Sequence, residues 1–594
     1  MDQKAPLPKV PEPRKFQIRI ESALGGLSIY DNYASADQFK TALGLDPDIA
    51  AAANYNTGAA ASSGWLTPMG ASVGSNFDGA SARARSAILW MVRNPKQMNQ
   101  VYCYGAAGSV YYFDPQVVNF VETGTGPTDL NDGGTASANG MAYYDNYIYA
   151  ARDTTIARFG PLDSIGTAAW TDDYWTTTLG KTAMTNSTYP LHPYSTSVKL
   201  PNHVMLRHSD GKLYIADVVG NQGVLHCIST TKTTAEGDTD NGSTFNAVDF
   251  PYGMWPTALA SYGDQIAVGL FEGQALNSLS SNYVPPRARL ALWSPSNPTT
   301  YDLLTNEEFP DPYIYAMLNS NGALYIFSGD TLAFNTSGIA TGCRITRYLG
   351  GKTFEQVGFI DYALPPFPGG VEGHLNKIYF GSQISYPIYT GCVFAIGQKK
   401  SPISNAIFNV FNISNTTAST EQISGSDITY NTMVTSIASL QQKGAARVSM
   451  DVMWARGESG AGIGGDLADR RYGWNTMVPF TRHDTAIYKS NTFRIGEPFK
   501  ITKIRVNLAG GIQASTNIEP VIYTDDETNT YTLNTINQGT DGTTTRSVVR
   551  RPTNATGQHN FYFHLKWRKA NDGSGVLCSV AFPIVIDGEY VSDN

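Results

Sequence analysis

The segment Gly322-Ala-Leu-Tyr-Ile326 carries the pattern that decides the fold: a turn residue, one spacer, an apolar residue, Tyr or Ala, and a second apolar residue. Neighbouring copies of this pattern lie 47, 65, 53, 58 and 54 residues apart. These spacings are too long for a hairpin and are typical of one propeller blade plus a loop. The six copies are Asn99-Gln-Val-Tyr-Cys103, Asn146-Tyr-Ile-Tyr-Ala150, Gly211-Lys-Leu-Tyr-Ile215, Asp264-Gln-Ile-Ala-Val268, Gly322-Ala-Leu-Tyr-Ile326 and Asn376-Lys-Ile-Tyr-Phe380.

Each copy of this signature strand has apolar strands on either side of it in the sequence. Ile88-Leu-Trp-Met91 precedes the first copy, and Val110-Tyr-Tyr-Phe113 follows it. Small residues after the signature strand suit blades that crowd together near an axis. We therefore predict an all-β chain with a six- or seven-bladed β-propeller over residues 16–424, in which the strand Phe16–Ile20 could close the ring with a late strand. The alternative is a set of unrelated hairpins with similar turns.

The two ends of the chain differ from this central region. Residues 1–15 contain four prolines, which predicts an extended arm because proline fixes φ and lacks a backbone donor. From residue 425 the signature stops and alternating strands follow, among them Arg447–Met453, Phe499–Val506 and Phe561–Leu565. We predict that residues 425–594 form a jelly-roll-like β-sandwich.

Composition excludes some classes of function. The chain has 594 residues with a net charge of −8 and a pI near 5.5, so non-specific binding to nucleic acid or to an anionic membrane is not expected. This net charge does not exclude a local basic patch. Its five widely spaced cysteines favour buried thiols over a disulfide framework or a zinc knuckle. The charged, proline-rich start lacks the apolar core of a signal peptide, and no run of about 20 apolar residues follows. We expect synthesis in the cytoplasm and no membrane insertion.

Several groups of residues have the residue types of a binding site but lack the spacing or the structural context that the site requires. Residues 460–465 match a dinucleotide fingerprint but lie among strands, so a loop is favoured. His203 and His208, five residues apart with Asp210 nearby, would point to opposite faces of a strand, and His559 and His564 share this defect. We expect no metal and no cofactor.

Several carboxylates could belong to a catalytic or calcium site, but each has a simpler structural interpretation. Asp217, Asp264 and Asp330 lie at strand ends where a glycosidase site could form in a propeller channel, but Asp at a turn usually caps its own backbone. Asp525-Asp-Glu527 resembles a calcium loop only in charge, so a solvated turn is favoured. We predict no enzymatic activity and no catalytic residue.

Aromatic residues in a polar loop are the candidates for interaction. Trp170, Tyr174 and Trp175 lie among Thr and Asp, and exposed rings there could stack on sugars or pack against a neighbouring subunit. Packing within the chain itself is the default interpretation.

The proline-bearing arm, the Tyr-rich propeller of irregular blade length and the terminal sandwich together resemble the structural proteins of tailed bacteriophages, namely the tail nozzle, tail-tip or neck proteins. The segment Tyr488–Val506 is similar to the one with which many such proteins enter the sandwich. The resemblance implies a virion subunit repeated in a ring around the tail channel. Its partners would be other copies of itself, neighbouring tail proteins and DNA that passes without specific binding.

The sequence alone is therefore consistent with three functions. The first is a non-enzymatic structural protein of the virion tail. The second is a carbohydrate-binding protein of the tail tip that reads a host surface glycan through aromatic loops or the sandwich. The third is a propeller glycoside hydrolase.

Overall fold

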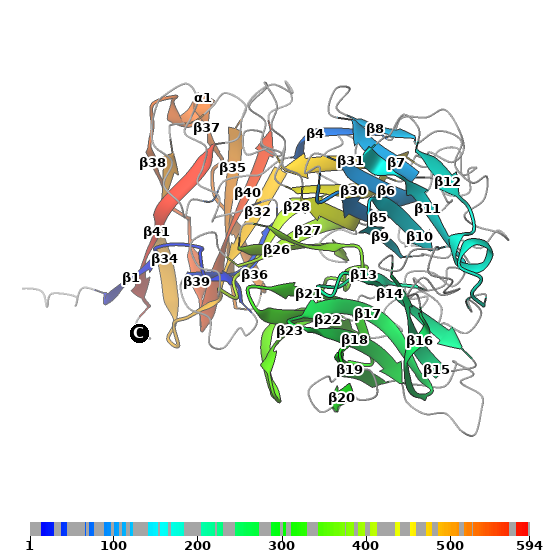
Figure 1. Ribbon diagram of the computed structural model, residues 1–594. Coiled ribbons are helices and arrows are strands. Elements are labelled where there is room, and N and C mark those ends of the chain that lie inside the picture. Colours follow the sequence, from blue (N-terminus) through cyan, green and yellow to red (C-terminus); the bar gives the residue numbers. More distant parts are fainter. Residues whose placement is uncertain are drawn as a thin grey trace, which may run out of the picture. The chain divides into compact units, whose positions relative to one another are not determined.

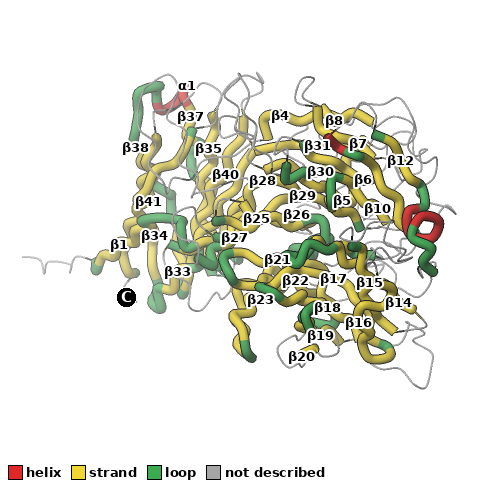
Figure 2. The backbone as a smooth tube through the Cα atoms, in the orientation of Figure 1, coloured by secondary structure: helices red, strands yellow, loops and turns green. Residues whose placement is uncertain are grey.

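In the computed structural model of the chain, the regular secondary structure is almost entirely β-strand (Figures 1 and 2). The all-β prediction is confirmed. The described helices are one short α-helix, α1 (Gln538–Asp541), and one π-helical turn, η3 (Tyr174–Thr178). The structure describes residues 13–28, 37–43, 45, 66, 71–76, 88–96, 100–105, 110–114, 119–122, 140–151, 155–163, 168–182, 184, 203–219, 222–229, 244–272, 287–297, 301–304, 311–329, 342–374, 376–384, 390–397, 404–412, 434–439, 452–458, 471–477, 485–509, 512, 516–525, 527–569 and 578–591.

Seven four-stranded sheets follow one another through the described part of the chain. In order, they comprise β5 (Ile88–Arg93), β6 (Val101–Gly105), β7 (Val110–Asp114) and β8 (Asn119–Glu122); β9 (Met141–Tyr144), β10 (Tyr147–Ala151), β11 (Ile156–Gly160) and β12 (Ala169–Thr171); β13 (Met205–Arg207), β14 (Leu213–Val219), β15 (Gln222–Ile228) and β16 (Thr244–Tyr252); β17 (Met254–Tyr262), β18 (Gln265–Glu272), β19 (Arg287–Trp293) and β20 (Tyr301–Leu304); β21 (Tyr313–Ser320), β22 (Ala323–Gly329), β23 (Cys343–Gly350) and β24 (Thr353–Ile360); β25 (Val371–His374), β26 (Lys377–Ile384), β27 (Thr390–Ile396) and β28 (Ile407–Asn412); and β29 (Val434–Ser439), β30 (Val452–Glu458), β31 (Arg471–Met477) and β4 (Ala71–Asn76).

The first strands of these sheets form a closed cycle. Each first strand lies against the first strand of the next sheet, in the order β5, β9, β13, β17, β21, β25 and β29, and β29 lies against β5 again. Figure 1 shows these sheets following one another, from blue through green to yellow. Sheets that touch side by side around a cycle have the arrangement of a β-propeller.

Each of the six signature segments is the second strand of its sheet, namely β6, β10, β14, β18, β22 and β26. In the copies whose turn the structure describes, the turn is tight and includes a residue with positive φ, as at Asn146 (68°), Gly211 (81°) and Gly322 (80°). Glycine and asparagine tolerate this left-handed conformation best, which explains their place in the pattern.

Small residues directly after the signature segments let neighbouring sheets approach. A Cβ added to Gly269 in β18 would lie 2.8 Å from a side-chain carbon of Ile314 in β21. A Cβ added to Gly381 in β26 would lie 2.4 Å from the carbonyl oxygen of Val434 in β29. Both distances are shorter than carbon contacts allow, so the crowding expected from the sequence is present.

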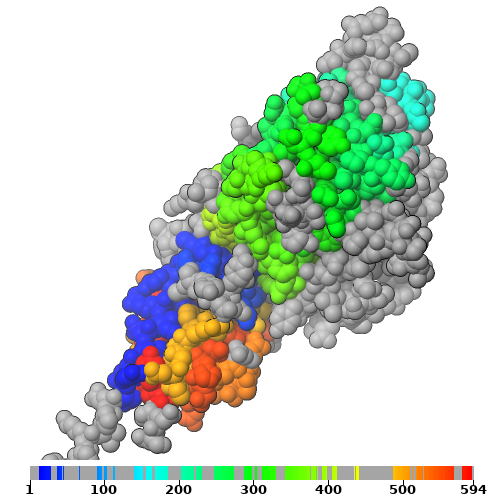
Figure 3. All heavy atoms as spheres, turned by 90° about the horizontal axis from the view of Figure 1, so that it is seen from below, coloured from blue at the N-terminus to red at the C-terminus, as the bar shows by residue number. Residues whose placement is uncertain are grey.

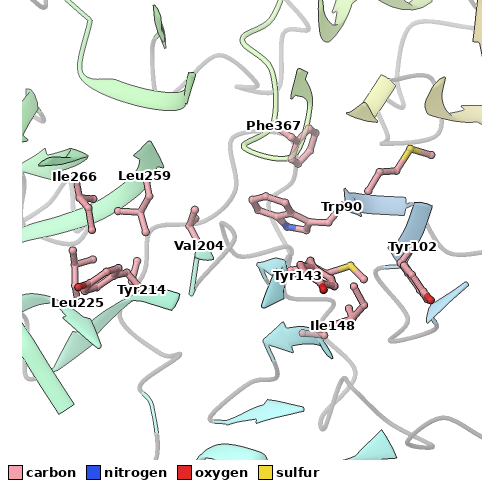
Figure 4. Packing of buried hydrophobic residues seen from close by; sticks show 14 of the residues in the cluster. Trp90, Tyr102, Tyr143, Ile148, Val204, Tyr214, Leu225, Leu259, Ile266 and Phe367 are labelled. Atoms are coloured by element: carbon pink, nitrogen blue, oxygen red, sulfur yellow. The ribbon is translucent and has the colours of Figure 1, made fainter. Parts of the chain in front are cut away.

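Aromatic and aliphatic side chains from several sheets form the largest described core. Trp90, Tyr143 and Phe367 belong to it together with Leu259 and Ile266 (Figure 4). All five cysteines are buried and form no disulfide, as predicted. The core is therefore a packed apolar interior built from residues far apart in the sequence.

By mutual contacts the chain divides into two units, one of residues 71–405 and 412–478 and one of residues 1–70, 406–411 and 479–594. The second of these units, called here the terminal unit, contains two further sheets. One has the order β1 (Lys15–Ile20), β41 (Ser579–Tyr590), β34 (Phe499–Ala509) and β38 (Ser547–Arg550), with β39 (Ala555–Gly557) also on β34. The other has the order β2 (Gly26–Leu27), β3 (Gln38–Leu43), β32 (Thr485–Ser490), β40 (Asn560–Lys569), β35 (Thr516–Thr524) and β36 (Asn529–Thr532), with β33 (Phe493–Arg494) on β40 and β37 (Ile536–Asn537) on β35.

Residues from both ends of the chain build the terminal unit. Strand β1 pairs antiparallel with β41, from Lys15 opposite Glu589 to Ile20 opposite Ile584. Figure 3 shows blue N-terminal atoms among orange and red C-terminal atoms. The two sheets meet through their apolar faces, where the rings of Phe499 and Phe561 lie 5.6 Å apart.

The structure draws the domain boundaries differently from the sequence-based prediction of 16–424 and 425–594. The strand Phe16–Ile20 joins β41 in the terminal unit, and the strand that completes the last sheet of the cycle is β4, which pairs with β31. Strand β30, which includes Met453, belongs to the cycle of sheets and not to the terminal unit. The arm, residues 1–15, lies outside the described residues except for 13–15.

No helix within the described ranges is long and apolar enough to cross a membrane.

Candidate functional site

The three aromatic residues singled out from the sequence lie at one end of the β9–β12 sheet. Trp170 is in β12, and Tyr174 and Trp175 are in the π-helical turn η3 that follows. Asp173 starts this turn: its carboxylate accepts hydrogen bonds from the backbone N–H of Thr176 (2.8 Å) and from the hydroxyl of Thr155. Burial alone would raise the pKa of Asp173, but these hydrogen bonds outweigh burial and hold the pKa at about 2.

Trp175 is completely buried, and Tyr174 is only 5 % exposed. The indole N–H of Trp175 donates to the carbonyl of Thr182 at 2.8 Å, and the indole ring lies 5.3 Å from the His226 ring. These two rings are therefore not available for stacking on a sugar or a neighbouring subunit. They pack within the chain, so the default interpretation is confirmed for them.

A cation–π stack holds Tyr174 in place. The guanidinium carbon of Arg158 lies 3.8 Å from the centre of the Tyr174 ring and 4.3 Å from that of Tyr147. Tyr149 meets Tyr174 edge to face, with ring centres 5.6 Å apart. Burial is the main cause that raises the pKa of the Tyr174 hydroxyl, so this hydroxyl stays protonated at neutral pH.

Trp170 differs from the other two because it keeps part of its surface in solvent. Its ring lies 5.1 Å from that of Phe159 and packs against the large core. Of the three predicted interaction residues, Trp170 alone remains accessible to a partner.

Beneath Trp175 lies a polar cluster that was not predicted from the sequence. Asp217 in β14, His226 in β15 and His203 before β13 have no exposed surface. Because Ile215 is directly opposite His226, Asp217 and His226 point to the same face of the sheet. The Asp217 carboxylate accepts from His226 Nε2 at 3.0 Å and from the backbone N–H of Val218 at 2.8 Å.

His203 completes the cluster from the other side. Its Nδ1 donates to the carbonyl of Ala216 at 3.1 Å and lies 3.6 Å from an Asp217 carboxylate oxygen. Burial is the largest cause of a lowered pKa at His226, and nearby His203 adds to it, although Asp217 acts in the opposite direction. His226 is therefore a neutral imidazole at pH 7.

A carboxylate–imidazole pair can act as a general base when a substrate reaches it. In this cluster all three side chains are sealed from solvent, so the pair links β14, β15 and the segment before β13 as a buried polar network. The sequence signal for it was a single histidine in the apolar strand Val224-Leu-His-Cys227. The histidine in this strand did not indicate that Asp217 is its hydrogen-bond partner.

The other carboxylates and histidines of interest have local structural roles. His208 bonds Ser261 (3.1 Å) and the carbonyl of Asp264 (3.2 Å), so it does not share a site with His203. Asp210 accepts from the Tyr214 hydroxyl at 2.6 Å. Asp330 and residues 460–465 lie outside the described residues.

Asp525 caps a turn of the terminal unit. It accepts backbone N–H groups from Gln558 (2.8 Å) and His559 (2.9 Å). Although burial acts to raise its pKa, these bonds hold the pKa below its ordinary value. Across the described ranges, no group of three or more His, Cys, Asp or Glu residues is arranged to hold a metal ion.

No protein family matches the sequence, and no curated protein matches it either. Solved structures with a similar fold include the N-terminal domain of Nup159, with 8 % identity and a TM-score of 0.34, covering 69 % of this chain and 98 % of that chain. The β-propeller domain of Cps50 (Swd1) from Myceliophteria thermophila has 9 % identity and a TM-score of 0.32, covering 66 % and 96 %. A family 43 arabinoxylan arabinofuranohydrolase from Bacillus subtilis has 12 % identity and a TM-score of 0.27, covering 86 % and 96 %. These values are too low to carry an argument about function.

Proposed function

We propose that the chain is a non-catalytic structural subunit of a tailed-bacteriophage type of virion, built from a seven-bladed β-propeller and a jelly-roll-like β-sandwich. In this proposal it is made in the host cytoplasm and assembles as a ring in the tail, at the nozzle, tip or neck. Its partners are further copies of itself and neighbouring tail proteins, and DNA passes through the ring without specific binding.

One observation carries this proposal: each unit is locked by strands that are distant in the sequence. Strand β4 (residues 71–76) pairs with β31 (residues 471–477), and β1 (residues 15–20) pairs with β41 (residues 579–590). Unravelling the chain from its N-terminal end must therefore break strand ladders in both units. A ring of sheets leaves only short, protected edges and so resists both unfolding and unwanted edge-to-edge association, as a subunit under mechanical load requires.

The charge of the chain agrees with a passive channel. A net charge of −8 repels the phosphate backbone, so DNA would slide past such a ring and not adhere to it.

Quantitative mass spectrometry of particles purified from the source culture tests the proposal. We expect peptides of this chain at several copies per particle, in a fixed ratio to other tail proteins. Antibody labelling in electron microscopy should then mark the tail. Absence of the chain from particles whose other tail proteins are detected would contradict the proposal, and the fold would stand.

A further inference from the structure

One sheet of the terminal unit carries an unusual set of side chains on the face opposite its apolar core. Residues directly opposite one another across β32, β40 and β35 are Lys489, His564 and Val521. Tyr562, two residues before His564, is opposite Tyr523. Because side chains alternate along a strand, Lys489, His564, Tyr562 and Tyr523 share this face, while Phe563 and Leu565 point to the core.

The two tyrosines form a stacked platform with cations above it. Their rings are nearly parallel, with an interplanar angle of 10° and centres 4.7 Å apart. Lys489 Nζ lies 5.7 Å from the centre of the Tyr562 ring, and Lys40 Nζ from β3 lies 5.6 Å from it. Two ammonium groups thus converge on one ring, which is attractive for the ring but repulsive between the lysines.

His564 is the unexplained residue of this face. Its side chain is buried, with 8 % of its surface exposed, yet neither ring nitrogen has a hydrogen-bond partner. Its ring lies 6.1 Å from that of Tyr523. An imidazole always has at least one N–H to donate, and leaving a buried donor unpaired costs about 1–3 kcal/mol.

The remaining charges on this face are balanced in part. Glu527 accepts a hydrogen bond from the Tyr562 hydroxyl, and Glu519 is directly opposite Lys566. Burial is the largest cause that lowers the pKa of Lys489; the Glu527 charge opposes this shift, and the Lys40 charge adds a smaller lowering. An additional negative group near Lys40 and Lys489 would relieve their repulsion.

We propose that this face, formed by Lys40, Lys489, His564 and the Tyr523–Tyr562 platform, is a binding site for an oxyanion such as a phosphate or carboxylate group. The oxyanion lies between the two ammonium groups and accepts the N–H of His564, so that both the repulsion and the unpaired donor are resolved. Tyr523, which is partly exposed, and exposed Glu527 mark the side from which a ligand enters. The inference does not depend on the proposed tail function.

Titration of the full-length protein with inorganic phosphate, and separately with acetate, at constant ionic strength tests this site. Calorimetry should show saturable binding of at least one of the two anions, and comparison of the two identifies the preferred oxyanion. Lys40→Met and Lys489→Met keep the aliphatic stems and remove the charges, so each should weaken binding at least tenfold. Lys352→Met, at an exposed position in the other unit, is the matched control and should leave binding unchanged.

His564→Phe separates binding from folding. It keeps a flat ring in the buried position and removes both nitrogens, so the thermal unfolding midpoint without anion should be preserved or raised while anion binding is lost. Equal affinities in the wild type, Lys40→Met and Lys489→Met proteins would overturn the proposal. So would the absence of saturable binding of both anions to the wild type.

Discussion

At the scale of single residues, the closest approach between sheets depends on the absence of a side chain. Gly381 faces the carbonyl of Val434, 2.4 Å from the place of a Cβ, whereas the nearest neighbour of a Cβ at Gly373 is 3.6 Å away. We expect Gly381→Ala to reduce the free energy of unfolding by about 1–3 kcal/mol because the sheets must separate. Gly373→Ala, in the adjacent strand, should change it by less than about 0.5 kcal/mol. Urea unfolding of both variants measures the difference, and equal values would contradict the crowding.

Trp175 provides a second test at this scale. Because its ring is fully buried against His226, Trp175→Ala should lower the free energy of unfolding by about 3–5 kcal/mol. Trp170→Ala should cost clearly less, since that ring is partly exposed. Thermal unfolding of the two variants compares them. A negligible loss in Trp175→Ala would show that the ring is exposed in solution.

The sequence could not reveal the burial of Trp175. Its neighbours in Thr171–Thr178 are polar, which is typical of an exposed loop, whereas its contacts come from a strand far along the chain. The same holds for Asp217 and His226, which meet only when β14 and β15 pair in register. Local patterns identify strands, but they do not identify which polar residues meet.

At the scale of elements, strands with a recurrent or alternating apolar pattern could be predicted from the sequence, and strands without one could not. All six signature strands were predicted, since the turn and the alternation recur together. Strand β4, Ala-Ser-Val-Gly-Ser-Asn, has only one large apolar residue, so periodicity could not identify it. A seventh blade was allowed for, but its strand near Met453 was assigned to the sandwich because β30 lacks the turn pattern.

Strand β1 covers the edge of β41, and its removal should expose that edge. A chain that begins at residue 22 lacks β1 and leaves Ile584 and Ile586 without their partners Ile20 and Ile18. We expect it to self-associate at micromolar concentration, as size-exclusion chromatography would show, because the edge is then the apolar β41 and not β1, whose exposed Lys15 and Arg19 protect it from pairing. A chain that begins at residue 13 keeps β1 and should elute as the full-length protein does. Identical elution of both truncated chains would contradict the role of β1.

At the scale of the whole molecule, stability should depend on pH through buried histidine. Burial first, and then Lys489 and Lys566, lower the pKa of His564 to about 4. The unfolded chain therefore binds more protons than the folded chain between pH 6.5 and about 4, so stability is present above pH 6.5 and is lost as pH falls through this window. Between pH 7 and pH 4.5, the wild type should lose on the order of 2 kcal/mol more than His564→Phe, measured by urea unfolding. Equal losses would contradict a neutral, buried His564.

The central claim is that the seven sheets form a ring closed by β4 and β31, and a pair of engineered cysteines tests it most directly. Gly74 and Asn475 are directly opposite in this ladder, and the five native cysteines are buried and do not compete. Under mild oxidation, Gly74→Cys with Asn475→Cys should form a disulfide, which peptide mass spectrometry detects. Gly74→Cys with Arg471→Cys should not, because the partners are about 13 Å out of register. A disulfide in the first pair alone is the predicted result, and no disulfide, or equal yields in both pairs, would contradict the closed ring.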